Sequence, residues 1–253
     1  NMIPDVLTTQ LRDPDGAVPV GQRVLRIATH PAVRSRGLGS KLLTEIATEF
    51  GDAVDWLGTG FGATPELVAF WQRNDYHTVH LSTTRNDASG EHSAIMLNPC
   101  SERGRALAHR HTDWFHRRIE SALTDPLATV DPDVVRAALR SVRRSPELSL
   151  SEWEWRLVAG VPRGAATIDT APGPFRRLVL TSLMDDETEP LEPREERVLV
   201  SKILQARDWS AVTEAFDFVS PAECKRYTSR AIGTLLETHG TTFARNELGD
   251  IDG

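Results

Sequence analysis

The sequence has 253 residues, of which 40% are hydrophobic, and a formal net charge of −7. This length is enough for one large domain or two small ones with a hydrophobic core. No stretch approaches the roughly 18 uninterrupted apolar residues of a membrane span, and the first residues lack the pattern of a secretory signal, so we expect a cytoplasmic protein without a membrane partner. Cys100 and Cys224 have no Cys or His at metal-ligand spacing, which argues against a disulfide framework and a metal site.

Residues 1–22 mix polar, proline and glycine positions without sustained periodicity, and we predict a linker or lead-in there. Residues 23–99 show an α/β pattern. Thr64 is expected to cap a helix that has Pro65 in its first turn. The predicted strands cover 23–30, 54–58, 77–84 and 93–97, and the predicted helices cover 40–50 and 65 to about 74.

Beyond Pro99 the strand signals end and helical patterns follow. We therefore place a domain boundary near residue 100, with an all-helical region over 100–253. Its first element is a long helix predicted over 101–123. Capping boxes precede two later helices, Ser151 with Glu154 and Ser220 with Glu223.

The segment from Arg34 to Gly39 reads Arg-Ser-Arg-Gly-Leu-Gly and lies between a predicted strand and a predicted helix. Its glycines let the backbone turn sharply and expose N–H groups at a helix N-terminus, where the helix dipole favours a phosphate or diphosphate. Taken alone, the hexapeptide fits a ligand-free turn equally well. It is neither a Walker loop nor a Rossmann fingerprint, because the Gly-Lys-Ser/Thr ending and the third glycine are absent.

Three further blocks, in order, make the pattern more specific. They are Gly60-Phe61-Gly62-Ala63-Thr64-Pro65-Glu66-Leu67, then Phe70-Trp71-Gln72-Arg73-Asn74-Asp75-Tyr76, and Ser89-Gly90-Glu91-His92-Ser93-Ala94-Ile95-Met96-Leu97. Together with the glycine turn they resemble the acetyl-CoA core of GNAT acetyltransferases and, more narrowly, the C-terminal part of the tRNA(Met) cytidine acetyltransferase family. The resemblance implies an α/β GNAT fold, N-terminally incomplete, followed by an all-helical region that binds tRNA.

The cofactor implied by this resemblance is acetyl-CoA. The backbone of Ile27, Ala28 and Thr29 would hold the pantetheine and acetyl group, and Glu66 and Arg73 would complete the site. The diphosphate loop would comprise Arg34, Ser35, Arg36, Gly37, Leu38, Gly39 and Ser40. Without the resemblance, Glu66 and Arg73 fit an ordinary first-turn acid and a solvated helix-face cation.

The family also has a helicase-like ATPase module, for which ATP would be the nucleotide. This sequence contains no GxxxxGK[ST] loop, and too few residues precede Arg23 for the opening strands and helices of a GNAT fold. We therefore interpret the chain as a C-terminal portion, without a site for ATP.

The implied reaction is transfer of acetyl from acetyl-CoA to the exocyclic amine of cytidine at the tRNA(Met) wobble position, which forms N4-acetylcytidine. The lone pair of this amine is delocalised into the ring, so the reaction needs positioning, proton removal and oxyanion stabilisation. His92, with Glu91 beside it, is the candidate base. The pair could equally begin a strand with a purely structural role, and water could serve as the base.

From 100 to 145 the chain carries nine arginines against six acids. Arg103, Arg110 and Arg117 recur every seven residues and so fall within about 40° of each other on a helix, with Arg118 beside them. His109, His111 and His116 are expected to widen this polar face. The face fits either a solvated helix surface or phosphate contacts to tRNA, and the resemblance favours tRNA.

Two alternatives stay open. One is a GNAT N-acetyltransferase that acts on a protein or small-molecule amine, and the other is a non-catalytic module that binds tRNA. Acetyl-CoA binding would separate the second alternative from both enzymes.

Overall fold

The computed structural model describes residues 2–87, 90–185, 187–188 and 190–249, so Ser89 of the last sequence block lies outside the described residues. The chain divides into two compact units. The α/β unit comprises residues 1–115 and 141–143, and the helical unit comprises 116–140 and 144–253. The boundary predicted near residue 100 differs because helix α4 (Glu102–Thr124) begins within the α/β unit, where Leu107 joins the apolar cluster of the sheet.

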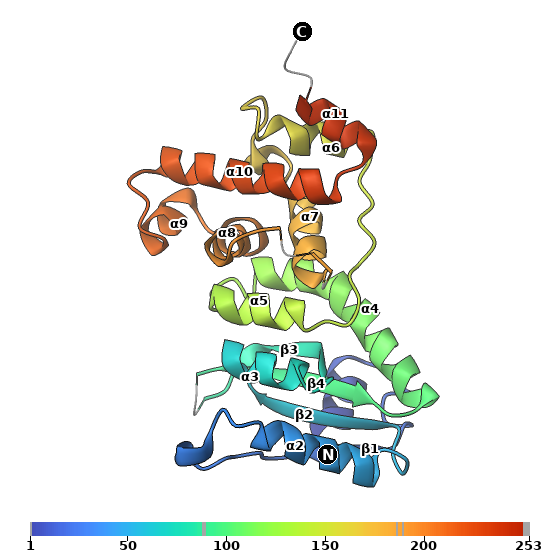
Figure 1. The fold of residues 1–253 in the computed structure, drawn as a ribbon. Helices are drawn as coiled ribbons and strands as arrows, with labels where there is room; N and C mark the ends of the chain where they lie inside the picture. Colours follow the sequence, from blue (N-terminus) through green and yellow to red (C-terminus); the bar gives the residue numbers. More distant parts are fainter. Residues whose placement is uncertain (1, 88–89, 186, 189, 250–253) are drawn as a thin grey trace. The chain divides into compact units, whose positions relative to one another are not determined.

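A four-stranded mixed sheet forms the centre of the α/β unit (Figure 1). The strand order is β1 (Gly21–Val24), β2 (Trp56–Gly62), β4 (His92–Pro99) and β3 (His77–Arg85). The first pair is parallel and the other two pairs are antiparallel. The helices predicted in this unit are confirmed as α2 (Leu38–Phe50) and α3 (Pro65–Gln72), and Thr64 Oγ1 accepts the Leu67 N–H at 3.3 Å as the predicted cap.

Residues 2–10 are folded, unlike the lead-in expected from the sequence. They form the short helix α1 (Met2–Asp5) and the π-helix η1 (Val6–Gln10). Ile3 and Leu7 are fully buried in one cluster with residues of β2 and β4. Strand β2 makes room for them, since a Cβ at Gly58 would lie 3.0 Å from Ile3 Cδ1 and a Cβ at Gly60 would overlap Met2 Cε.

A buried carboxylate ties the segment after η1 to α4. Asp13 is 2% exposed and accepts hydrogen bonds from Arg110 Nε and Nη2, at 3.0 and 2.7 Å, and from His111 Nε2 at 2.9 Å. The sequence predicted His111 on the polar face of the helix, but in the structure His111 is fully buried beside Asp13. Burial alone would raise the pKa of Asp13, but the hydrogen bonds from Arg110, the Asp15 amide and His111 hold this pKa below its usual value.

The strand predicted over 23–30 is shorter in the structure, because β1 ends at Val24 and residues 25–30 have no regular secondary structure. Val24 pairs with Thr59, so the next pair would involve Gly60. The Gly60 carbonyl oxygen is instead bonded to the Arg23 side chain, whose Nη2 donates to it at 3.3 Å. The backbone of residues 25–29 therefore leaves the sheet and keeps polar groups available for a ligand.

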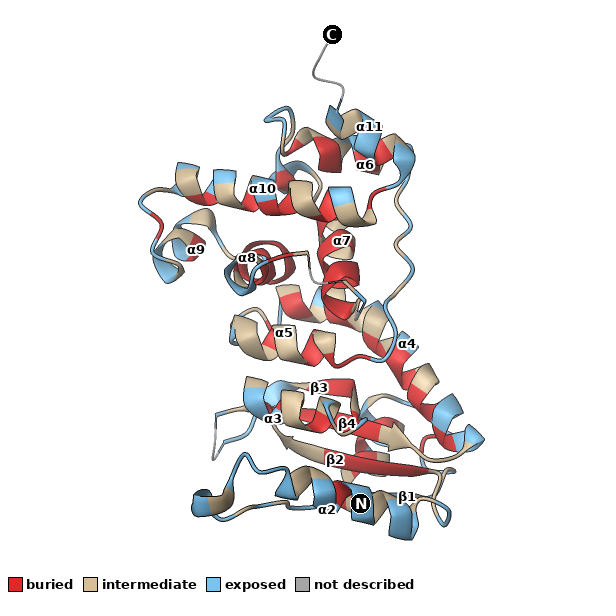
Figure 2. Ribbon diagram, viewed as in Figure 1, coloured by how far each residue is buried: buried red, intermediate tan, exposed pale blue. Residues whose placement is uncertain are grey.

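The helical unit confirms the all-helical prediction. The predicted Ser151–Glu154 capping box is present with both of its hydrogen bonds. At Ser220 only one of the two is present: the Ser220 side chain accepts the Glu223 N–H, but the Glu223 carboxylate accepts the N–H of Val219 instead of the N–H of Ser220. Figure 2 shows α7 buried along most of its length. Besides the end of α4, the elements are α5 (Pro132–Arg140), α6 (Glu152–Gly160), η3 (Ile168–Thr170), α7 (Pro172–Met184), α8 (Pro193–Leu199), η4 (Val200–Leu204), α9 (Trp209–Ala215), α10 (Pro221–His239) and α11 (Thr242–Gly249).

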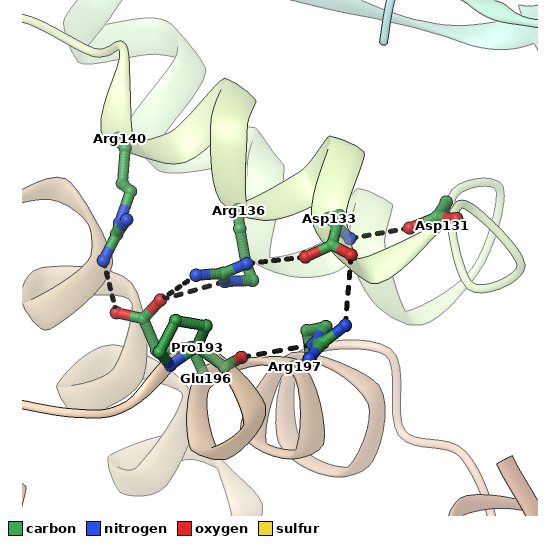
Figure 3. A network of polar contacts seen from close by, with 7 residues as sticks. All are labelled: Asp131, Asp133, Arg136, Arg140, Pro193, Glu196 and Arg197. Carbon is green, nitrogen blue, oxygen red and sulfur yellow. Dashed lines mark hydrogen bonds and ion pairs between the residues drawn. The ribbon is translucent and has the colours of Figure 1, made fainter. Parts of the chain in front are cut away.

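An ion-pair network joins α5 to α8 within this unit (Figure 3). Glu196, 4% exposed, accepts from Arg136 Nη2 at 2.6 Å and from Arg140 Nη2 at 2.8 Å. Arg136 also contacts Asp133 at 2.6 Å, and Arg197 lies 3.5 Å from the other oxygen of that carboxylate. Two of the nine arginines that make the 100–145 stretch basic are thus neutralised inside the fold.

Candidate functional site

The turn before α2 has the geometry of an anion site. Ser35 and Gly37 both have positive φ, 58° and 74°, and Gly37 is the N-cap of α2 without a side-chain cap. The first helical hydrogen bond runs from the Lys41 N–H to the Gly37 carbonyl oxygen at 2.9 Å. The N–H groups of the three residues between them therefore have no acceptor within the helix and, with the helix dipole, favour a negatively charged group.

A pocket of about 640 Å³ lies over this turn. Its volume is within the range of about 300–1,000 Å³ that small-molecule sites occupy. Val33, Leu67 and Phe70 contribute apolar lining. The pocket brings together all the predicted cofactor residues except Arg36, namely Ile27, Ala28, Thr29, Arg34, Ser35, Gly37, Leu38, Gly39, Ser40, Glu66 and Arg73.

Close packing between α2 and α3 shapes the pocket. A Cβ at Gly39 would lie 3.1 Å from Phe70 Cζ, so glycine allows the aromatic ring to approach the start of α2. Arg34 Nε donates to the Thr29 carbonyl oxygen at 3.4 Å, which links the diphosphate loop to the segment that leaves the sheet. Arg73, at the end of α3, is exposed and permanently charged, as a phosphate partner should be.

The predicted base and its neighbour are absent from the lining of this pocket. His92 is 6% exposed, and its Nδ1 lies 2.8 Å from the Ser82 carbonyl oxygen. That contact makes Nδ1 the donor and leaves a lone pair on Nε2, which is buried without a hydrogen-bond partner in the part of the chain that the structure describes. The Glu91 side chain lies against Gly62 of β2.

The four arginines predicted to contact RNA differ in their surroundings. Arg103 and Arg117 are exposed. Arg110 is engaged by Asp13, and burial lowers the pKa of Arg118 to about 10. The α4 stripe therefore offers two exposed cations instead of four.

The described residues offer neither a metal-binding cluster nor a membrane-spanning helix. No group of three His, Cys, Asp or Glu side chains there could hold a metal ion. No described helix is both long and apolar enough to cross a membrane.

The mixed sheet, the glycine turn before α2 and the pocket over it define a class of protein. Residues 41–101 match the family model described as GNAT acetyltransferase 2. The chain thus has the α/β GNAT fold predicted from its sequence, followed by a helical region.

Comparison with curated proteins narrows this class. The chain is 58% identical to the tRNA(Met) cytidine acetyltransferase TmcA of Haloarcula marismortui and 54% identical to that of Haloferax volcanii, over 98% of its own length in each case. It is 35% identical to TmcA of Pyrococcus furiosus over 83% of its length. It covers 32%, 33% and 26% of these relatives, about a third or less of each. These findings confirm that the chain is a relative of the tRNA(Met) cytidine acetyltransferases.

Proposed function

We propose that this chain is the acetyl-CoA-binding, tRNA-facing part of a cytoplasmic RNA cytidine acetyltransferase that forms N4-acetylcytidine. The observation that carries the proposal is the pocket at the start of α2. It is lined by the predicted diphosphate loop except Arg36, by Ile27, Ala28 and Thr29, and by Glu66, Leu67, Phe70 and Arg73 of α3 and its C-cap. Relatives at 58% and 54% identity bear the name of that activity. A cytidine of tRNA(Met) is the substrate that this name supports, and we propose the one at the wobble position.

The residues of the pocket fit acetyl-CoA. The N–H groups of Leu38, Gly39 and Ser40 would bind the diphosphate together with Arg34 and Arg73. The backbone of residues 25–29 would bind the amide groups of pantetheine, since the sheet uses none of its N–H and C=O groups and only the Thr29 carbonyl oxygen is engaged, by Arg34. Bound there, acetyl-CoA would supply an acetyl group already activated as a thioester.

The chain contributes positioning and charge stabilisation at this site. A backbone N–H of the segment Ile27–Thr29 would polarise the acetyl carbonyl, because fixed donors aimed at a developing oxyanion are effective catalysts. Holding the cytidine amine beside that carbonyl makes the attack effectively unimolecular. Both contributions come from backbone geometry, which the positive-φ turn and the early end of β1 create.

His92 is proposed as the proton acceptor, with Glu91 as its neighbour. The Nδ1 contact with Ser82 leaves Nε2 able to accept a proton. Because His92 is absent from the pocket lining, water remains the competing base. A His92→Gln variant that keeps acetyl-CoA affinity but loses about 100-fold or more in kcat supports the role, whereas an unchanged kcat assigns the proton transfer elsewhere.

Calorimetry with acetyl-CoA tests the proposed function, and the turn supplies a matched pair of variants. Arg73 lines the pocket, whereas Arg36 belongs to the same loop region, is exposed and does not line it. Arg73→Ala should weaken binding by about tenfold or more, because it removes charged hydrogen bonds. Arg36→Ala should bind like the wild type. Absence of acetyl-CoA binding by the wild-type chain would reject the enzyme assignment.

The product test uses the full-length protein, with ATP supplied for the ATPase module that the family resemblance implies. Incubation with tRNA(Met), acetyl-CoA and ATP, followed by nucleoside mass spectrometry, should detect N4-acetylcytidine. Acetylation of a protein or polyamine mixture in place of tRNA would favour the alternative GNAT function.

A further inference from the structure

A second pocket, of about 610 Å³, lies within the helical unit and has no part in the site described above. It opens between the first half of α10 and the turn that follows α6. Val161, Pro162 and Gly164 form one wall, and Lys225, Arg226 and Arg230 line the other. We refer to it as the α10 groove.

The scaffold of this groove is rigid. The opposite face of α10 is buried through Cys224, Thr228 and Ala231, with further apolar residues along the helix. Helix α10 also lies close to the wall of the groove, since a Cβ at Gly233 would come within 3.6 Å of Pro162 Cγ. The cations therefore project from a fixed helix face instead of a loop.

The charge of the groove is positive in an acidic protein. The chain has a net charge of −7, yet three exposed cations meet here. Within the described residues, Arg226 and Arg230 form no ion pair with a carboxylate, unlike Arg110, Arg136 and Arg140. Glu223 also lines the groove, but its carboxylate accepts the Val219 N–H at the start of the helix. A polyanion would therefore find here uncommitted positive charge at a concave surface.

Two of these cations lie over aromatic rings that pack against the apolar cluster next to the groove and do not line it. Arg230 lies over the Tyr227 ring at 5.7 Å from its centroid, and Lys225 lies over the Trp209 ring at 5.5 Å. These contacts hold the cations in place. The guanidinium forks of Arg226 and Arg230 match the geometry of phosphate groups, and the relatives are named for an activity on tRNA, so we take a nucleic-acid backbone as the occupant.

We infer that the α10 groove binds the phosphodiester backbone of the RNA substrate through Arg226 and Arg230. This inference deepens the proposed function and rests on it for the identity of the RNA. The principal contact with RNA phosphates is thereby placed in the α10 groove instead of on α4. On α4, Arg110 is already neutralised by Asp13, and Arg118 is half-buried. Such contacts position the RNA without reading its bases.

Titration of fluorescently labelled tRNA by the 253-residue chain over a series of KCl concentrations tests the inference. The double variant Arg226→Ala/Arg230→Ala removes two exposed side chains, so circular dichroism should show the wild-type fold. Loss of two phosphate contacts should lower the slope of log K against log salt by about 1.4–1.8. Affinity at the lowest KCl concentration of the series should fall about tenfold or more.

The matched control is Arg105→Ala/Arg156→Ala. Both arginines are exposed and pair with glutamates, Arg105 with Glu102 at 2.9 Å and Arg156 with Glu247 at 3.4 Å, so this control removes the same charge without removing uncommitted cations. It should retain the wild-type slope. An equal decrease in the control would show that net charge alone, and not the α10 groove, determines RNA affinity.

Three further results would also overturn the inference. The first is wild-type affinity and slope in the Arg226→Ala/Arg230→Ala variant. The second is no tRNA binding by the wild-type chain. The third is a loss of poly-glutamate binding by the variant as large as its loss of tRNA binding, which would assign the groove to acidic protein segments. Acetyl-CoA affinity, measured on the same variants, should not change. If the groove variant binds tRNA like the wild type and acetyl-CoA binding is intact, the α10 groove is rejected and the proposed function is retained. Absence of acetyl-CoA binding by the wild-type chain rejects the proposed function independently of the groove.

Discussion

Replacement of Asp13 by Ala should destabilise the α/β unit strongly, although Asp13 lies far in sequence from its partners. Its carboxylate is 2% exposed and accepts from Arg110 and from the fully buried His111. Breaking a buried pair by removing one partner costs about 3–5 kcal/mol, and we expect about 3 because Arg110 is a third exposed and can regain water. That loss is large against a total stability of about 5–15 kcal/mol.

Urea unfolding followed by circular dichroism at pH 7 measures this effect. Asp15→Ala is the matched control, because Asp15 belongs to the same segment and is exposed. The control should change the free energy of unfolding by about 0.5 kcal/mol or less. Equal losses in both variants, or a loss below about 1 kcal/mol in Asp13→Ala, would show that the buried contacts of Asp13 do not stabilise the α/β unit.

The same residue predicts a pH dependence. The pKa of Asp13 is lower in the folded chain than in the unfolded one, so its contribution to stability is complete above the unfolded pKa of about 3.9 and is lost as the pH falls through the folded pKa. Wild-type stability should therefore decrease more steeply than that of Asp13→Asn as the pH falls below about 4. Parallel curves for the two proteins would show that another group dominates acid unfolding.

Two further substitutions probe the helical unit and the cofactor pocket. Glu196→Gln should cost about 2–4 kcal/mol of unfolding free energy, because it leaves Arg136 and Arg140 without their buried carboxylate. Glu152→Gln, at an exposed pair with Arg156, should cost about 1 kcal/mol or less in the same urea titration. Similar losses in the two variants would contradict this prediction. Gly39→Val should weaken acetyl-CoA binding at least about tenfold with little change in melting temperature, because the valine side chain would displace Phe70 in the pocket. Unchanged affinity in calorimetry would show that the close approach of Gly39 and Phe70 does not shape the site.

The elements predicted from the sequence depend on local signals. Helices α2 and α3, strands β3 and β4, and the long α4 follow from periodicity and from caps such as Thr64. The pocket residues follow from the glycine turn and from family blocks that lie close together along the chain. Their assembly into one pocket requires only that α2 and α3 pack on the same sheet.

The features that the sequence did not predict depend on partners far along the chain. Asp13 lies 97 residues from Arg110, and Glu196 lies 60 residues from Arg136, so a local window counts those arginines as available for RNA. The burial of α1 needs the glycines of β2, which open space that only the folded sheet reveals. A hydrophobic signal at Ile3, Val6 and Leu7 was present, but it is too short to distinguish a helix from a lead-in.

The early end of β1 has a similar origin. A run of β-branched and apolar residues predicted a strand to His30, yet the Arg23 side chain occupies the Gly60 carbonyl and ends the pairing at Val24. This competition between a side chain and a backbone acceptor is invisible in a single segment. It is also what leaves the backbone next to the pocket unpaired.

In the proposed function, main-chain amides at the start of α2 bind the diphosphate of acetyl-CoA. Nuclear magnetic resonance of the ¹⁵N-labelled chain, titrated with acetyl-CoA, observes those amides directly. We expect large, saturable shifts for Leu38, Gly39 and Ser40, and no comparable shifts along α10. Binding that leaves these three amides unperturbed while shifting others would contradict the claim.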